Sequence, residues 1–527
     1  MERTQTTKRF LLAASVCLVI VIVLTRGLSL THNLFGHPDE HVFYTSTELL
    51  MLDLLGEDSY EPVKAYPEGT FVFRLPFQLL ARAFPLDADY GVSVDIWGRV
   101  ASVFYYTAGA LLGLWLVCDP LKGGKAGGVI YVLAAGFGLF QIEQSRYGTF
   151  DPISFLLLTL LITLCVLALR REKTHFLLLS AFVVGIAAAG KYPLLYFMLV
   201  PLAVLLLQKP RGQRLAGTLA GMACCALLGF LLFSPSVVRS PRFFLSAILG
   251  GVDGYLVGGN PEGYSTVPES LVSVLIYHGF YSDLPLAGLF ALSCTRALAK
   301  DGTASAERRF LSRMLPVIVV VFLCYNLLLT TFFLRTLFPW FCLSMLYACA
   351  GLGRLCRSRG WRIAALALCL AMTARGAALV AMLDTGREAR AVLEMRQAVE
   401  QTGGDPALLS SFFFDYDLKR SLPDSLRTVE IMQLYEGNFP TLEPGEQILT
   451  GSMEHGLAKR CLFPPNKEWT ANITAGWTQF KEENARWLVA RLYPNWIYPA
   501  FGFWVHGSTA TDYEFPTNWL YVRPAGE

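Results

Sequence analysis

Two adjacent carboxylates stand in the segment His37-Pro38-Asp39-Glu40-His41, shortly after a long apolar run at the start of the chain. Pro38 suits the first turn of a helix, because its missing N–H needs no partner there. Asp39 and Glu40 would then lie at the positive end of the helix dipole, which favours their charged forms. A charged carboxylate close to a membrane surface can take a proton from a sugar or protein hydroxyl. Helix capping alone would also account for two acids at this point.

Histidines flank the same acidic pair. His37 and His41 are four residues apart, so they would share one face of a helix. Together with Asp39 or Glu40 they offer mixed nitrogen and oxygen ligands of the kind that zinc, manganese or magnesium accepts. The segment therefore predicts a divalent-metal site as one alternative, and surface histidines without a cofactor as the other.

A second group of candidate residues stands at the ends of apolar runs. Lys191 and Arg335 each mark such an end, and Arg146 and Asp151 stand close together between two other runs. At the depth of a lipid phosphate, arginine can hold phosphate with two hydrogen bonds and lysine as a point charge. Ordinary anchoring at the membrane interface would explain the same basic residues. Asp151 before a proline is equally typical of a helix start.

The segment from Thr70 to Phe84 has the pattern of a helix that lies in the membrane interface. Arg74, Gln78 and Arg82 are spaced four apart and would share one helical face, while the remaining faces are apolar. The two arginines would either meet lipid phosphates or extend their charged ends to water beside the bilayer.

The elements that position these residues are membrane helices. The 527 residues are 54% hydrophobic and only 16% charged, against about 25% charged in a typical soluble domain. Runs of roughly 20 apolar residues, enough to cross a bilayer, predict an α-helical polytopic membrane protein with about 11 transmembrane helices. We place them near residues 10–30, 99–118, 126–142, 153–169, 175–190, 193–207, 215–236, 270–293, 314–334, 336–353 and 363–383. The net charge of +3 is too small to indicate a nucleic-acid partner.

The loops between these spans alternate in basic content. One set is rich in Lys and Arg, namely residues 8–9, 122–125, 170–173, 209–214, 296–313 and 354–362. The positive-inside rule makes this set cytoplasmic, so the N-terminus would be cytoplasmic and the C-terminal part external. The chain shows no eukaryotic retention or targeting signal, which favours a bacterial cell membrane.

We divide the chain into a transmembrane domain, residues 1–384, and a C-terminal external domain, residues 385–527. The first external loop, about residues 31–98, would carry the interfacial helices. The tail is long enough for a small domain of its own. It shows a helical pattern over 387–402 and strand-like runs over 408–414, 428–434, 447–449 and 519–522, which predict a mixed α/β fold.

The order of these features resembles the C-type glycosyltransferase superfamily, and in particular its protein O-mannosyltransferase and aminoarabinose-transferase branch. The resemblance covers about residues 8–385 and depends on the acidic pair, on topology and on four further stretches. These stretches are Asp95–Val100, Gln144–Pro152, Gly185–Pro193 and Arg335–Pro339. The chain departs from the family pattern at Thr336, where an aromatic is usual. A proline-rich segment of the first loop is also reduced to Tyr66-Pro67-Glu68.

The resemblance implies a polyprenyl-phosphate sugar donor, inversion at the sugar carbon, and a hydroxyl acceptor on a lipid, a cell-wall polymer or a protein. On this basis we expect Asp39 to act as the general base and Glu40 to assist it. Other residues would stabilise charge on the departing phosphate or bind substrate. The expected phosphate-binding residues are Lys191, Tyr192, Arg146 and Arg335, and the expected substrate-binding residues are Asp151, Arg74 and Arg82.

Three other functions fit the same pattern. A polymerase or ligase that uses a lipid-linked oligosaccharide would share the topology and the type of donor. A transporter or flippase of lipid-linked saccharides would place ionisable groups near the bilayer midplane, whereas here they gather at the external ends of spans. A non-catalytic subunit of a glycosylation complex would tolerate the loss of Asp39.

Overall fold

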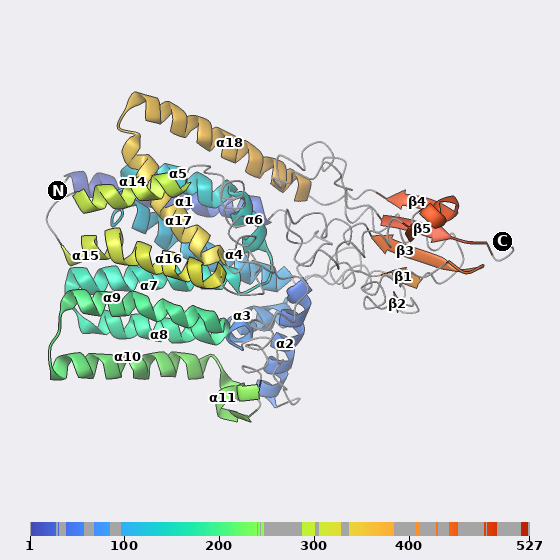
Figure 1. Cartoon of the computed structure of the whole chain (residues 1–527), viewed down its shortest axis with the longest axis horizontal. Helices are drawn as coiled ribbons and strands as arrows, with labels where there is room; N and C mark the ends of the chain where they lie inside the picture. Colours follow the sequence, from blue (N-terminus) through green and yellow to red (C-terminus); the bar gives the residue numbers. More distant parts are fainter. Residues whose placement is uncertain are drawn as a thin grey trace.

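The computed structural model shows a bundle of long helices with a small β-sheet beyond one end (Figure 1). The N-terminus lies at the end of the bundle that is remote from the sheet. The structure describes residues 2–27, 30, 38–56, 68–84, 96–239, 241–242, 244–246, 287–300, 305–327, 337–383, 407–409, 428–429, 442–451, 479–480, 482–492 and 518–524.

The bundle starts with α1 (Glu2–Ile22), which continues as the π-helical turn η1 (Val23–Gly27). The other helices of the bundle are α4 (Ile96–Cys118), α5 (Gly124–Phe137), α6 (Leu139–Arg146), α7 (Asp151–Arg171), α8 (Thr174–Gly190), η2 (Tyr192–Met198), α9 (Leu199–Gln208), α10 (Gln213–Leu232), α14 (Ala287–Lys300), α15 (Ala306–Arg309), η3 (Phe310–Met314), α16 (Leu315–Leu327), α17 (Phe338–Leu355) and α18 (Arg359–Leu383). Within its apolar stretch, 78% of α7 is buried but only 17% of α10. Helix α7 is therefore an inner helix, and α10 presents most of its apolar surface outward, as a lipid-facing helix does.

Each predicted span coincides at least in part with a described helix, although for the eighth, 270–293, only the residues from 287 onward are described. Among the described residues, five helices are apolar enough by length and composition to cross a membrane: the α1–η1 segment, α4, α7, α10 and α18. The pair α5–α6, bent by 56°, would make a sixth, and α8 and η2–α9 are shorter apolar helices. The count of about 11 spans thus stays a prediction. The run 126–142, which we expected as one span, is broken at Gly138.

Close helix packing depends on small residues, as is usual between membrane helices. Helices α8 and α10 lie so near one another that a Cβ atom on Gly185 would overlap the carbonyl oxygen of Ala226. The same holds in the opposite direction, since a Cβ atom on Gly229 of α10 would overlap the carbonyl oxygen of Phe182 on α8. These two glycines set the distance between the helices.

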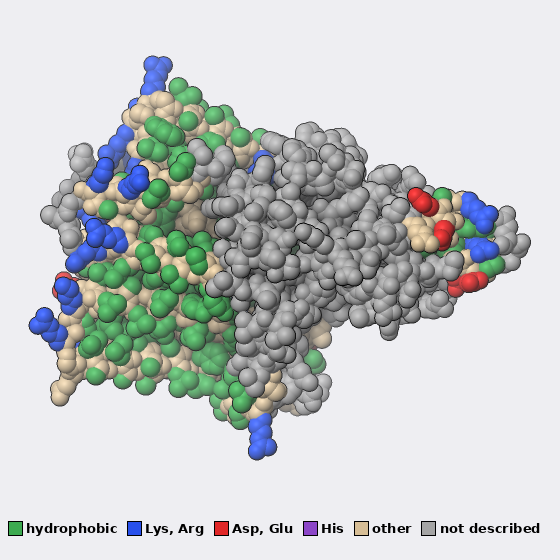
Figure 2. Space-filling view, in the orientation of Figure 1, with side chains coloured by type: hydrophobic (Ala, Val, Ile, Leu, Met, Phe, Trp, Pro, Cys, Tyr) green, Lys and Arg blue, Asp and Glu red, His purple; other side chains and the backbone are tan. Residues whose placement is uncertain are grey.

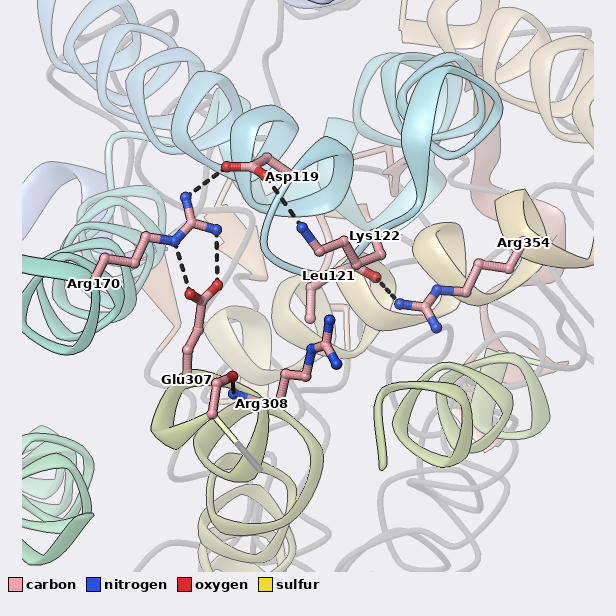
Figure 3. A network of polar contacts seen from close by, with 8 residues as sticks. Asp119, Leu121, Lys122, Arg170, Glu307, Arg308 and Arg354 are labelled. Carbon is pink, nitrogen blue, oxygen red and sulfur yellow. Dashed lines mark hydrogen bonds and ion pairs between the residues drawn. The ribbon is translucent and has the colours of Figure 1, made fainter. Parts of the chain in front are cut away.

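Lys and Arg side chains gather at the end of the bundle where the N-terminus lies, and hydrophobic side chains cover its flank (Figure 2). We call this end the basic pole. A polar network crosses it (Figure 3). There Arg170, at the end of α7, donates two hydrogen bonds of 2.8 Å to Glu307 of α15 and one of 2.6 Å to Asp119 after α4. Arg354 of α17 donates to the carbonyl oxygen of Leu121 at 2.9 Å. The network ties four helices together at the basic pole.

Three further helices lie toward the opposite pole: α2 (Pro38–Leu55), α3 (Gly69–Ala83) and the short α11 (Pro235–Arg239) (Figure 1). Helices α2 and α3 pack through Phe43 and Phe71, whose ring centroids are 6.1 Å apart. Asp53 of α2 forms an ion pair with Arg239 of α11. The segment predicted to carry interfacial helices therefore does contain two helices, and they cover the end of the bundle remote from the basic pole.

The strands in the described part of the chain form one five-stranded sheet in the order β2-β1-β3-β5-β4. Strands β1 (Ala407–Leu409), β2 (Thr428–Val429) and β3 (Gln447–Gly451) are parallel, while β5 (Asn518–Val522) runs antiparallel to β3 and to β4 (Leu488–Leu492). Each predicted strand-like run overlaps one of these strands, and β4 was not predicted. The predicted helix over 387–402 lies outside the described residues, and the boundary at 384/385 stays a prediction.

Candidate functional site

An ion pair lies at the pole opposite the basic one. Asp151 is the first residue of α7, where Pro152 follows it, and its carboxylate is buried. Lys191 directly follows the last residue of α8, in extended backbone. Its Nζ lies 3.1 Å from Oδ1 of Asp151, with the lysine side chain 25% exposed and the aspartate side chain 6% exposed. Thr149 adds a longer hydrogen bond of 3.4 Å from its hydroxyl to Oδ2. The aspartate therefore holds a partly accessible ammonium group in place.

Helix α3 lies across this pair. Arg74 is buried and donates from Nη1 to the carbonyl oxygen of Gly148 at 3.0 Å, in the turn that precedes Asp151. Thr70 donates to the carbonyl oxygen of Gly190 at 3.2 Å, in the residue before Lys191. A Cβ atom on Gly69 would come within 2.6 Å of the backbone carbon of Ala189, so only glycine permits this approach. Helix α3 thus contacts both turns that carry the ion pair.

The predicted polar face of α3 is only partly confirmed. Arg74 and Gln78 are both buried, whereas Arg82, one turn further, is exposed. Arg74 lies inside the protein instead of meeting lipid phosphates. The difference arises because the first half of α3 packs on the ends of α7 and α8, which periodicity within one helix does not reveal. Arg82 does not contact the ion pair in any interaction that the structure defines.

Arg146 is the last residue of α6 and is fully buried. Its guanidinium lies 5.9 Å from the ring centroid of Tyr147, and the turn from Tyr147 to Phe150 leads directly to Asp151. Tyr192 follows Lys191 and begins η2. The structure therefore brings together three of the predicted site residues, Arg74, Asp151 and Lys191, and Arg146 and Tyr192 adjoin them in the chain.

Several predicted residues cannot be placed in this way. Asp39, Glu40 and His41 belong to the first turn of α2, but the positions of their side chains lie outside what the structure describes. His37 and Arg335 lie outside the described residues altogether. Within the described part of the chain, no three His, Cys, Asp or Glu side chains are grouped to hold a metal ion. The metal site at His37 and His41 stays a prediction.

The structure draws attention to three charged residues to which the sequence gave no role in the site, although Arg99 stands in one of the stretches that carried the resemblance. Arg26 is fully buried at the end of the first span, and Arg99 is buried at the start of α4, where it donates to the carbonyl oxygen of Leu30 at 3.1 Å. Glu68, which precedes α3, is buried and accepts a hydrogen bond of 2.8 Å from the backbone N–H of Ser236. Burial raises the pKa of the Glu68 carboxyl above its ordinary value of 4.5. Arg26 falls inside the predicted span 10–30, and an arginine within an apolar run is the sequence signal that could have pointed to it.

Comparisons with known proteins add a fold likeness. No protein-family model matches the chain, and no curated protein matches it. Among solved structures, the chain is similar to the crystal structure of ArnT from Cupriavidus metallidurans in the apo state. The identity is 15% and the TM-score 0.49, over 85% of this chain and 93% of that one. The function has to follow from the chain's own residues.

Proposed function

We propose that the chain is an integral membrane glycosyltransferase that moves a sugar from a polyprenyl-phosphate donor to a hydroxyl acceptor. The observation that carries the proposal is the arrangement around the Asp151–Lys191 pair. Residues from α3, from the α6–α7 turn and from the end of α8 meet there. Helix α3 lies toward the pole opposite the basic one (Figure 1). An apolar bundle with a held cation at one end suits a substrate that joins a phosphate to a lipid chain.

The orientation of the bundle follows from its charge. The basic pole corresponds to the cytoplasmic side by the positive-inside rule, so the ion pair lies on the external side. Nucleotide sugars are made inside the cell, and an external site therefore requires a carrier that crosses the membrane. We place the protein in a bacterial cell membrane with a cytoplasmic N-terminus and an external C-terminal domain.

The proposed reaction is an inverting displacement. Asp39 takes the proton of the acceptor hydroxyl, while the oxygen of that hydroxyl forms the new bond to the sugar carbon. The bond between that carbon and the phosphate oxygen breaks, and the carrier phosphate leaves with the electron pair. Lys191, with Arg335 and Arg146 as further candidates, stabilises the negative charge on the departing phosphate. Glu40 assists Asp39, and Asp151 keeps the ammonium of Lys191 at its place.

The test uses purified protein in detergent with a panel of polyprenyl-phosphate sugars. Release of carrier phosphate is compared between the wild type, Asp39→Asn and Glu48→Gln. Glu48 is a matched control because it is a half-buried carboxylate of the same helix, about 14 Å further along its axis. We expect release by the wild type and by Glu48→Gln, and loss of release in Asp39→Asn by about 100-fold or more.

Near-normal release by a folded Asp39→Asn protein would refute the role of the base. No release from any single-sugar donor, by a protein that still binds lipid-linked oligosaccharide, would instead favour the polymerase or transporter functions. Metal dependence is tested separately by elemental analysis and by activity in the presence of a chelator.

A further inference from the structure

A buried arginine supports the broken span beneath the candidate site. Arg26 lies in the π-helical turn that ends the first span, and its side chain has no exposed surface. A charge inside a bundle of apolar helices is costly unless strong hydrogen bonds surround it. The hydrogen bonds of Arg26 therefore indicate what the residue does.

The first role concerns α5. A helix leaves its last carbonyl groups without a donor inside the helix, and α5 ends at Phe137 because Gly138 adopts an extended conformation. Arg26 donates from Nη2 to the carbonyl oxygen of Ala135 at 2.8 Å and from Nη1 to that of Gly136. The positive guanidinium also lies at the negative end of the α5 dipole, where a cation is favoured.

The second role concerns α6. Nε of Arg26 donates to the hydroxyl oxygen of Ser145 at 2.9 Å. Ser145 belongs to the last turn of α6, and its own hydroxyl donates back to the carbonyl oxygen of Gln141. One planar group therefore holds the end of α5 and the end of α6 at once, across the 56° bend between them.

The surroundings keep this group fixed. Thr25 accepts a hydrogen bond of 2.5 Å from Nη1, and the guanidinium lies 4.9 Å from the ring centroid of Tyr106 in α4. The hydroxyl of Tyr106 donates to the carbonyl oxygen of Ala135 at 2.9 Å, the same oxygen that Arg26 reaches. These contacts, together with burial, leave Arg26 inside the protein and make it unsuited to binding substrate itself.

The residue after Ser145 is Arg146, and the turn that follows leads to Asp151. We propose that Arg26 is a positioning residue, which fixes the direction of α6 and so places Arg146 and the 147–150 turn for binding of the donor phosphate. This proposal rests on the proposed function for its effect on the donor, whereas its effect on α6 is independent of that function.

The test combines kinetics with hydrogen exchange, on full-length protein in detergent. The variants are Arg26→Gln, Arg26→Lys and Ser145→Ala, and the control is Arg9→Gln, which removes an exposed arginine at the other end of the same helix. We expect Arg26→Gln to raise the KM for the polyprenyl-phosphate sugar at least about tenfold, because small misplacements of binding groups have such effects. Arg26→Lys and Ser145→Ala should show smaller rises, and kcat should change less than KM in all three.

Amide exchange in residues 139–150 should become faster in the same order of variants, while α7 and α8 keep their wild-type protection. Arg9→Gln should change neither readout. Uniformly faster exchange with an unchanged KM in the folded fraction would assign Arg26 a general structural role and overturn the proposal. If the wild type releases no carrier phosphate but Arg26→Gln still loosens residues 139–150 alone, the proposed function fails and the positioning of α6 stands.

Discussion

The Asp151–Lys191 pair provides a quantitative test of the candidate site. At the separation of 3.1 Å, Coulomb's law with an effective dielectric constant of about 20 gives an attraction of about 5 kcal/mol. The lysine side chain is 25% exposed, so solvent screening and the desolvation of both groups reduce the net coupling. We expect a coupling free energy of about 0.5–3 kcal/mol, which is the range measured for residues in direct contact.

The perturbation is a double-mutant cycle with Lys191→Met and Asp151→Asn. Lys191→Met alone leaves a buried carboxylate with only the long hydrogen bond from Thr149, so it should destabilise the protein by about 2–4 kcal/mol. In the Asp151→Asn background the same change should cost less by the coupling free energy. The assay is unfolding in mixed micelles with increasing SDS, followed by helix content. Additivity within about 0.5 kcal/mol would show that the pair does not interact and would refute the reasoning.

The same variants test the link to function. Lys191→Met should weaken binding of polyprenyl phosphate, because the leaving group loses a cation, and Lys191→Arg should retain much of it. Asp151→Asn keeps the lysine but no longer holds its ammonium, so its loss of affinity should be intermediate. Equal affinity for polyprenyl phosphate in all four proteins would remove Lys191 from the phosphate site.

Three further outcomes follow from the structure. Glu68→Gln should raise the thermal stability at neutral pH. Because burial raises the pKa of Glu68, ionisation of this carboxyl costs the wild type stability as pH rises above 4.5. The gain in Tm of the variant should therefore vanish below that pH, and a constant difference in Tm across pH would contradict this. Arg170→Met should destabilise the protein by about 1 kcal/mol, because the network that it removes is exposed to solvent. The matched control Arg171→Met, also exposed, should have no such effect. A changed donor KM would argue against a purely structural network. Gly185→Ala should prevent close packing of α8 on α10 and destabilise the protein by about 1–3 kcal/mol or more. The control Gly217→Ala on α10 should not, because a Cβ atom there meets nothing within 4 Å. Equal SDS resistance of the two variants would show that the helices can separate freely.

Hydropathy alone located the helices well. Apolar runs such as 153–169 and 215–236 coincide with α7 and α10, because lipid exposure and internal hydrogen bonding leave a long apolar stretch little alternative to a helix. The break at Gly138 was not predicted. It is stable because Arg26, 109 residues away from Ala135 in sequence, supplies the donors that α5 lacks. No local pattern carries that information.

The ion pair shows what topology adds to local patterns. Asp151 and Lys191 were both placed on one side of the membrane, but their contact was not predicted. Helix α7 has 21 residues and α8 has 17, which correspond to about 31 Å and 26 Å. Two antiparallel helices of similar length return the chain to the level at which it started. The helical hairpin of α7 and α8 therefore brings Asp151 and Lys191 together, although they are 40 positions apart in the sequence.

Four of the cations at this pole, Arg26, Arg74, Arg99 and Lys191, divide into two kinds by what they bind. Arg26, Arg74 and Arg99 each donate to backbone carbonyl oxygens at positions where a helix ends or a turn begins. A rigid guanidinium with five N–H groups suits that purpose, because it satisfies several fixed acceptors at once. Lys191 differs, since its partner is a carboxylate and its side chain is partly exposed. A flexible ammonium can keep Asp151 and still turn toward an incoming phosphate. These three arginines therefore shape the site, and under the proposed function Lys191 is the one of the four cations that would meet the donor phosphate.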